Sequence, residues 1–101
     1  MKLTLFITKE LGLREGVSKQ TGMAWKTASY VGSVVGSPEV EMVVFDVKDG
    51  MAGRIDRLNL KPGKTYEVWL AFKANNNGDR WFNNIICTDA REILPQDEIN
   101  E

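Results

Sequence analysis

The sequence predicts a small all-β protein in which five strands and one short helix form a single closed β-barrel. Three observations support this fold class. Runs of β-branched and aromatic residues recur at strand length and are separated by turn residues. Only one segment spaces its apolar residues as a helix does. The chain of 101 residues suffices for one domain, and a domain of this size needs almost all of its apolar residues in one core.

The first half of the chain contains three predicted strands. Residues 2–8 alternate polar side chains with β-branched or large apolar ones, as a half-buried strand does. A mobile loop rich in glycine, serine and threonine is predicted at residues 16–22, and a second strand extends over residues 23–35. A turn at residues 36–39 precedes a third strand over residues 40–47. This strand is apolar on both faces, which predicts that both faces are buried.

Segment 49–58 breaks the strand pattern and predicts a short helix. Met51, Ile55 and Leu58 recur at helical spacing and would share one face of it. Asp49 would be the N-cap, because a carboxylate accepts hydrogen bonds from the free backbone N–H groups of a first helical turn. The side chains expected to point to solvent are Arg54 and Arg57.

Two further strands are predicted after this helix. A turn at residues 60–63 carries proline and glycine at its central positions, in the order of a type II turn. Residues 65–73 alternate clearly, and a hairpin turn at residues 75–79 leads into a fifth strand over residues 80–90. The expected inner face of the fourth strand consists of Tyr66, Val68, Leu70 and Phe72, and its outer face of Glu67, Trp69, Ala71 and Lys73.

The order of three strands, one helix and two strands is that of a five-stranded OB-fold (oligonucleotide/oligosaccharide-binding fold), with the helix between strands 3 and 4. The same spacing also permits a small sandwich with one helix. Residues 1–93 are assigned to the OB-fold domain. Residues 94–101 are predicted to be a short acidic tail, and we expect it to be flexible because it is rich in acidic residues and follows the last predicted strand.

Five short motifs occur in order along the predicted domain. They are Gly16-Val17-Ser18-Lys19, Trp25-Lys26 shortly after Gly22, Val44-Phe45, Leu60-Lys61-Pro62-Gly63 and Gly78-Asp79-Arg80-Trp81-Phe82-Asn83-Asn84-Ile85. In this order they resemble a family of small bacterial domains of unknown function whose members look like single-stranded-DNA-binding OB proteins. The resemblance covers residues 3–93. It implies an OB-fold and a nucleic-acid partner, and it implies no catalytic residue.

The second predicted strand departs from the pattern of that family. It has small residues at Ala28, Gly32 and Ser33, where larger or charged ones are expected. Small residues in a strand either alter its exposed face or mark a close approach of another segment.

The composition argues against an enzyme. The chain has no histidine, which is the commonest general base and zinc ligand, and its one cysteine, Cys87, is expected to be a buried strand residue. Pairs such as Asp46 with Asp49, or Glu39 with Glu41, arise by chance among 14 acidic residues. We therefore predict no enzymatic activity, no catalytic residue, no metal site and no cofactor. The single cysteine and the shortness of the apolar runs predict a cytoplasmic protein with no membrane partner.

Charge is distributed unevenly along the chain. Residues 1–91 carry all 13 Lys and Arg against ten acidic residues, which leaves +3, whereas residues 92–101 carry four acidic residues and no basic one. A basic body favours a polyanionic partner, and an acidic tail favours contacts with other proteins.

Proteins that bind single strands combine cations for the phosphates with aromatic faces for the bases. In an OB barrel these groups lie across strands 2 and 3 and between the loops that join strands 1–2 and 4–5. The predicted nucleic-acid-binding cations are Lys19, Lys26, Lys73 and Arg80, and the predicted stacking rings are Trp25, Trp69, Trp81 and Phe82. Trp69 is expected to be the most exposed ring. Trp81 and Phe82 point to opposite faces, so only one of them can belong to the core.

These observations predict a non-catalytic, sequence-tolerant binder of single-stranded DNA, or of RNA, acting in DNA replication, recombination or repair. The alternative is an OB module for protein interaction or oligomerisation without nucleic-acid binding, because a body charge of +3 attracts polyanions only weakly and strand edges also mediate association. A homodimer would double the basic surface. We therefore expect a homodimer or a higher homo-oligomer.

Overall fold

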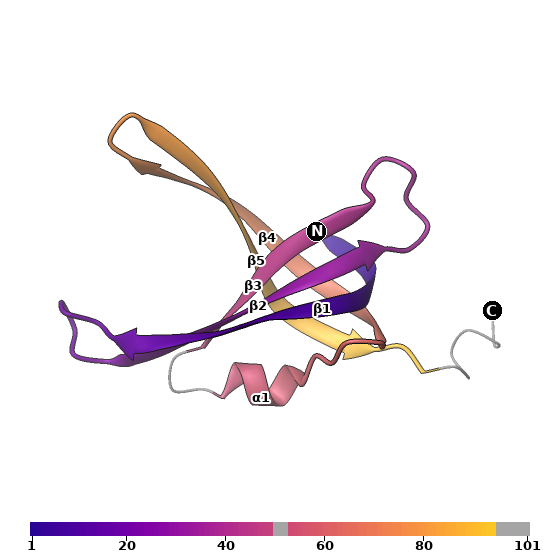
Figure 1. The fold of residues 1–101 in the computed structure, drawn as a ribbon, viewed down its shortest axis with the longest axis horizontal. Helices are drawn as coiled ribbons and strands as arrows, with labels where there is room; N and C mark the ends of the chain where they lie inside the picture. Colours follow the sequence, from indigo (N-terminus) through magenta and orange to yellow (C-terminus); the bar gives the residue numbers. More distant parts are fainter. Residues whose placement is uncertain (50–52, 95–101) are drawn as a thin grey trace.

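A computed structural model describes residues 1–49 and 53–94 of the chain. Over these residues, five strands and one short helix follow one another in the predicted order (Figure 1). The all-β class and the position of the helix between the third and fourth strands are confirmed. Met51 and the tail from residue 95 onward lie outside the described residues. The elements are β1 (Lys2–Val17), β2 (Ala24–Val34), β3 (Met42–Asp49), α1 (Arg54–Leu58), β4 (Thr65–Asn77) and β5 (Arg80–Glu92).

The five strands belong to one sheet that closes into a ring in the order β1-β2-β3-β5-β4. Neighbouring strands are antiparallel except β3 and β5, which meet in parallel where Asp46 pairs with Ile86. β4 returns to β1 along the first residues of the chain, from Lys2 opposite Trp69 to Phe6 opposite Thr65. A single closed sheet replaces the two-sheet sandwich that the spacing also permitted.

Two hairpins are longer than predicted and project beyond the ring. β1 continues past Thr8 to Val17, because register shifts after Ile7 and after Glu10 absorb the residues that break its alternation. β4 continues to Asn77, so the pairing of β4 with β5 also runs past the ring. Figure 1 shows the β1–β2 arm and the β4–β5 arm diverging on the same side of the ring.

The turn between β4 and β5 is tighter than expected. Asn75, Asn76 and Asn77 are strand residues that pair with Phe82, Trp81 and Arg80, not turn residues. Gly78 begins a two-residue turn with φ 67°. One residue with positive φ is enough to reverse the chain there, so the asparagines are free to extend the arm.

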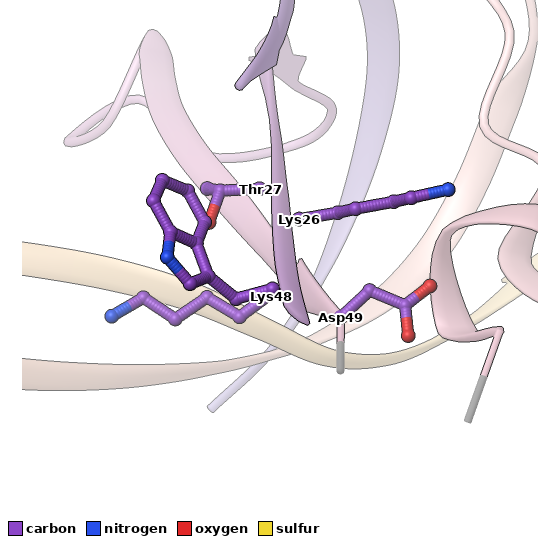
Figure 2. A pocket seen from close by; sticks show the side chains of 5 residues that line it. Lys26, Thr27, Lys48 and Asp49 are labelled. Carbon is purple, nitrogen blue, oxygen red and sulfur yellow. The ribbon is translucent and has the colours of Figure 1, made fainter. Parts of the chain in front are cut away.

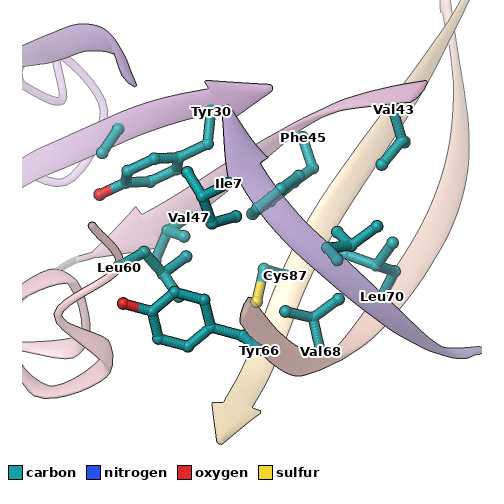
Figure 3. Packing of buried hydrophobic residues seen from close by; sticks show 12 residues of the cluster. Ile7, Tyr30, Val43, Phe45, Val47, Leu60, Tyr66, Val68, Leu70 and Cys87 are labelled. Carbon is teal, nitrogen blue, oxygen red and sulfur yellow. The ribbon is translucent and has the colours of Figure 1, made fainter. Parts of the chain in front are cut away.

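The core fills the ring with side chains from all five strands (Figure 3). Tyr30 stacks on Phe45 with ring centroids 5.7 Å apart and an interplanar angle of 26°. Cys87 is fully buried, as predicted, and burial raises the pKa of its thiol to about 11. Phe72 was expected to be a core residue, but it is 55% exposed because β4 has left the ring at that point. The most deeply buried large side chains are Tyr66, Phe45, Leu5, Ile7, Val47, Val68 and Cys87.

Gly32 explains one of the small residues in β2. It pairs with Ile7 of β1 and Val43 of β3 and is buried between them. A Cβ atom at this position would lie 3.1 Å from Cδ1 and 3.2 Å from Cβ of Leu5, which is itself fully buried. The Cβ of Leu5 moves only with its backbone, so Gly32 marks a close contact between β1 and β2.

We expect Gly32→Val to lower the free energy of unfolding by about 1–3 kcal/mol, because the added methyl groups overpack the core against Leu5. Urea unfolding followed by circular dichroism measures the loss. Ser33→Val is the control, since Ser33 lies on the outer face and should change stability by no more than about 0.5 kcal/mol. Equal stability of Gly32→Val and the wild type would contradict the packing at Gly32.

Helix α1 is capped from the end of β3. Gly53 occupies the N-cap position with φ 67° and offers no side chain, but Oδ2 of Asp49 accepts a hydrogen bond of 2.8 Å from the backbone N–H of Ile55. Asp49 therefore performs the predicted capping role from a position outside the helix. Hydrogen bonds from the backbone N–H groups, that of Ile55 foremost, hold the pKa of Asp49 below its ordinary value of 3.8.

The two helical arginines differ in exposure. Arg57 is exposed, as predicted. Arg54 is partly buried, and its Nε is buried without a hydrogen-bond partner in the part of the chain that the structure describes. The expectation that Arg54 points to solvent is wrong, because α1 packs against β3 and β5 and carries Arg54 with it.

The Asp49 cap predicts a dependence of stability on acid. Because the pKa of Asp49 is lower in the folded chain than in the unfolded one, its contribution is complete above pH 3.8 and is lost as the pH falls through the folded-state value. We expect the stability difference between the wild type and Asp49→Ala to narrow over this acid range, measured as urea midpoints at successive pH values. A difference that stays constant at all pH values would show that the carboxylate does not cap α1.

Candidate functional site

Trp25 lies at the start of β2 on the outer face of the ring, opposite Gly16 of β1. Its side chain is 41% exposed. A Cβ atom on Gly16 would lie 2.8 Å from Cζ2 and 3.0 Å from Cε2 of the indole, so the ring packs directly over the glycine. The absence of a side chain at Gly16 thus allows β1 to support one side of the indole.

The outer face beside Trp25 carries two cations that sequence reasoning missed. Thr27, the next residue of β2 on this face, has Arg14 of β1 and Lys48 of β3 as its cross-strand neighbours. Neither cation is close to Trp25 in sequence, and only the strand register brings them together. The pocket beside Trp25 has a volume of about 460 Å³. Its lining residues are Trp25, Lys26, Thr27, Lys48 and Asp49.

Lys26 does not share the face of its neighbour Trp25, since successive side chains of a strand point to opposite faces. Figure 2 shows Thr27 and Lys48 on one side of the strands and Lys26 and Asp49 on the other. The positive charge of Lys26 helps to lower the pKa of Asp49, after the dominant backbone hydrogen bonds. Lys48, rather than Lys26, is therefore the lysine on the face of the indole.

Arg14 is anchored on the outer face by a small polar cluster. Oγ of Ser29 donates a hydrogen bond of 2.6 Å to Oδ1 of Asp46. Nη2 of Arg14 lies 3.5 Å from Oγ of Ser29 and 3.8 Å from Oδ2 of Asp46. The guanidinium group thus stays over the sheet, next to Thr27, while most of it remains open to solvent.

The β4–β5 arm carries four of the predicted site residues. Trp81 is 69% exposed and Phe82 is 47% exposed. At most one of them could belong to the core, and in the structure neither does, because the arm extends beyond the ring and has no core on either face. The register places Phe82 on the same face as Lys73 and Arg80, and Trp81 on the opposite face.

Trp69 lies apart from the other predicted rings. It pairs with Lys2 of β1 and Asp89 of β5, in the part of the ring where β4 is flanked by strands on both sides. Trp69 is partly buried there. The expectation that it is the most exposed tryptophan is wrong, since Trp81 is more exposed.

Lys19 is exposed in a compact turn between β1 and β2. Oγ of Ser18 accepts hydrogen bonds of 3.3 Å from the backbone N–H groups of Gln20 and Thr21. The backbone N–H of Gly22 closes the turn on the carbonyl of Ser18 at 2.8 Å. Ser18 thus holds the turn that carries Lys19 at the end of the β1–β2 arm.

The predicted residues therefore form two groups. One lies around Trp25 and the β1–β2 arm, and the other on the β4–β5 arm, with Trp69 outside both. Among residues 1–49 and 53–94, no three Cys, Asp or Glu side chains gather as metal ligands would. Within the same residues, no helix is long and apolar enough to cross a membrane. Comparison with protein-family models, curated proteins and solved structures finds no match.

We expect Gly16→Val to displace the indole of Trp25, because the new Cβ would overlap the ring. In a Trp69→Phe, Trp81→Phe background, Trp25 is the remaining fluorophore, and its emission should shift to longer wavelength with stronger quenching by iodide. Val17→Thr, on the opposite face of the same strand, is the control and should leave the emission unchanged. Unaltered emission of Gly16→Val would argue against the contact.

Proposed function

We propose that this chain is a non-catalytic, sequence-tolerant binder of single-stranded DNA or RNA, built on an OB-type barrel. The strand order β1-β2-β3-β5-β4, with a helix between β3 and β4, supports the OB assignment. The observation that carries the function is the exposed indole of Trp25, supported on Gly16 and followed on the same face by Lys48 and Arg14.

Each part of this surface has a chemical role in the proposal. The indole of Trp25 offers a π-face on which any base can stack, which accounts for tolerance of sequence. Lys48 and Arg14 lie on either side of Thr27, the next residue of β2 on the face of Trp25. There they would neutralise phosphates of the bound nucleic-acid strand. Lys19 on the turn adds a further charge at the end of the β1–β2 arm.

The β4–β5 arm extends the proposed path. Phe82 lies on the face that also carries Lys73 and Arg80, so it repeats the combination of an aromatic ring with cations. Trp81 offers a second ring on the other face of the arm. Because the two arms diverge on one side of the ring, a flexible single strand would reach both, whereas a stiff duplex would not follow them. Such a binder suits replication, recombination or repair, in which unpaired strands occur.

Binding of an oligo-dT should quench tryptophan fluorescence and weaken with added salt, with a slope of about −0.7 per phosphate contacted. We expect Trp25→Ala to weaken binding by about 1–3 kcal/mol, the usual contribution of one stacked base. Trp69→Phe is the matched control and should bind as the wild type does.

The lysine on the face of the indole is tested in the same titration. Lys48→Gln should reduce the slope of binding affinity against salt concentration. Lys64→Gln should leave that slope unchanged, because Lys64 pairs with Glu92 at 3.4 Å outside the proposed path. No binding at low salt and micromolar protein would refute the proposal.

A protein-interaction module is the second candidate, and exposed apolar side chains favour it. Phe6 and Met42 flank Ser33 on the outer face, and Val44 lies one residue pair further along. These side chains are exposed and contiguous with the surface of β2. In this second candidate function, a second copy of the chain binds these apolar side chains. Sedimentation velocity tests it, since Met42→Lys would then convert a dimer into a monomer.

A further inference from the structure

A second pocket lies beneath α1 and shares no residue with the pocket beside Trp25. It has a volume of about 500 Å³ and opens between β1, β2, α1 and the segment that follows the helix. Its lining residues are Glu10, Tyr30, Ile55, Asp56, Asn59, Leu60 and Lys61.

Two tyrosine hydroxyls reach the α1 end of the core, and only one of them is satisfied. In Figure 3 the hydroxyls of Tyr30 and Tyr66 point the same way, past Leu60. That of Tyr66 donates to the carbonyl of Asn59 at 3.2 Å and accepts from the backbone N–H of Lys61 at 2.9 Å. As a whole residue Tyr30 is only 3% exposed, and its hydroxyl forms no hydrogen bond with a described residue. The ring is therefore held in the core, while the hydroxyl is the unpaired polar group that Tyr30 contributes to the pocket lining.

The charges around the Tyr30 hydroxyl are predominantly negative. Glu10 is the cross-strand partner of Tyr30 on β1, and Asp56 reaches the pocket from α1. Neither carboxylate forms an ion pair with a described residue, and Lys61 lines the pocket without pairing with either. Burial, and secondly the charge of Glu10, raise the pKa of Tyr30, so its hydroxyl stays neutral and can both donate and accept a hydrogen bond.

We propose that this pocket binds an alkylammonium or guanidinium group. Glu10 and Asp56 would supply the counter-charges, and the Tyr30 hydroxyl would accept a hydrogen bond from the cation. The pocket disfavours an anion, because two carboxylates face a single lysine of its lining. Such a cation belongs to a free polyamine or to an arginine or lysine side chain of another protein. This inference does not depend on nucleic-acid binding at Trp25.

Two probes distinguish these sources. Agmatine represents a free amine, and an acetylated, amidated Gly-Arg-Gly peptide represents a protein side chain. Either is titrated into the ¹⁵N-labelled protein at low salt, and we expect saturable shifts of the backbone amides of Glu10, Asn59 and Lys61. Response to agmatine indicates a small-molecule site, and response to the peptide alone indicates a protein contact. No saturable shift with either probe at millimolar concentration overturns the proposal.

Matched variants separate a built site from general attraction. Glu10→Gln should weaken binding about fivefold, as loss of one exposed counter-charge does. Glu15→Gln, on the same strand but outside the pocket, should have no effect. Lys61→Gln should tighten binding, because it removes a like charge. Tyr30→Phe keeps the ring in the core and should weaken binding about threefold without lowering stability. Equal effects of Glu10→Gln and Glu15→Gln, or unchanged binding in Tyr30→Phe, overturn the proposal.

Discussion

Asp46 connects the strand pairing that closes the ring with the arrangement of polar side chains on its outer face. Its backbone occupies the position at which β3 meets β5, and this is the pair that closes the sheet within the described residues. Its carboxylate accepts the hydroxyl of Ser29 and lies 3.8 Å from the guanidinium group of Arg14. A change in the closing strands would therefore move the side chains that hold Arg14. The candidate surface depends on the pairing of β2 with both β1 and β3, because cross-strand register alone brings Arg14, Thr27 and Lys48 together.

The two arms account for the exposed rings of this chain. Inside the ring, each strand has neighbours on both sides and a core on one face, so Tyr66 on the inner face is buried and Trp69 on the outer face is partly buried. Beyond the ring, each arm is a two-stranded ribbon with two solvated faces, and Trp81 and Phe82 are both exposed. Rings on such a ribbon contribute little to the core. Exposed rings of this kind are available to a ligand, and nucleic-acid bases are ligands that stack on them.

The sequence predicts the fold well where side chains alternate and less well where strands bulge or leave the core. The five strands, the position of α1 and the burial of Cys87 follow from pattern alone. The length of β1 does not, because two register shifts interrupt its alternation. The alternation of β4 correctly predicts which residues share a face of the strand. It does not predict where β4 leaves the ring, so the prediction that Phe72 is a core residue fails. Lys48 and Arg14 escape prediction because their proximity to Trp25 is a property of pairing between strands.

The nearly neutral net charge of −1 conceals two pockets whose linings have opposite balances of charged residues. The pocket beside Trp25 contains two lysines and one carboxylate, that of Asp49, whose Oδ2 accepts the N–H of Ile55 and whose Oδ1 is buried without a hydrogen-bond partner among the described residues. The pocket beneath α1 contains two carboxylates without ion pairs and one lysine. The two linings share no residue, so each pocket has its own set of charged side chains. A polyanion proposed at the first pocket and a cationic group proposed at the second would therefore contact different residues, and a weakly charged chain can carry both sites.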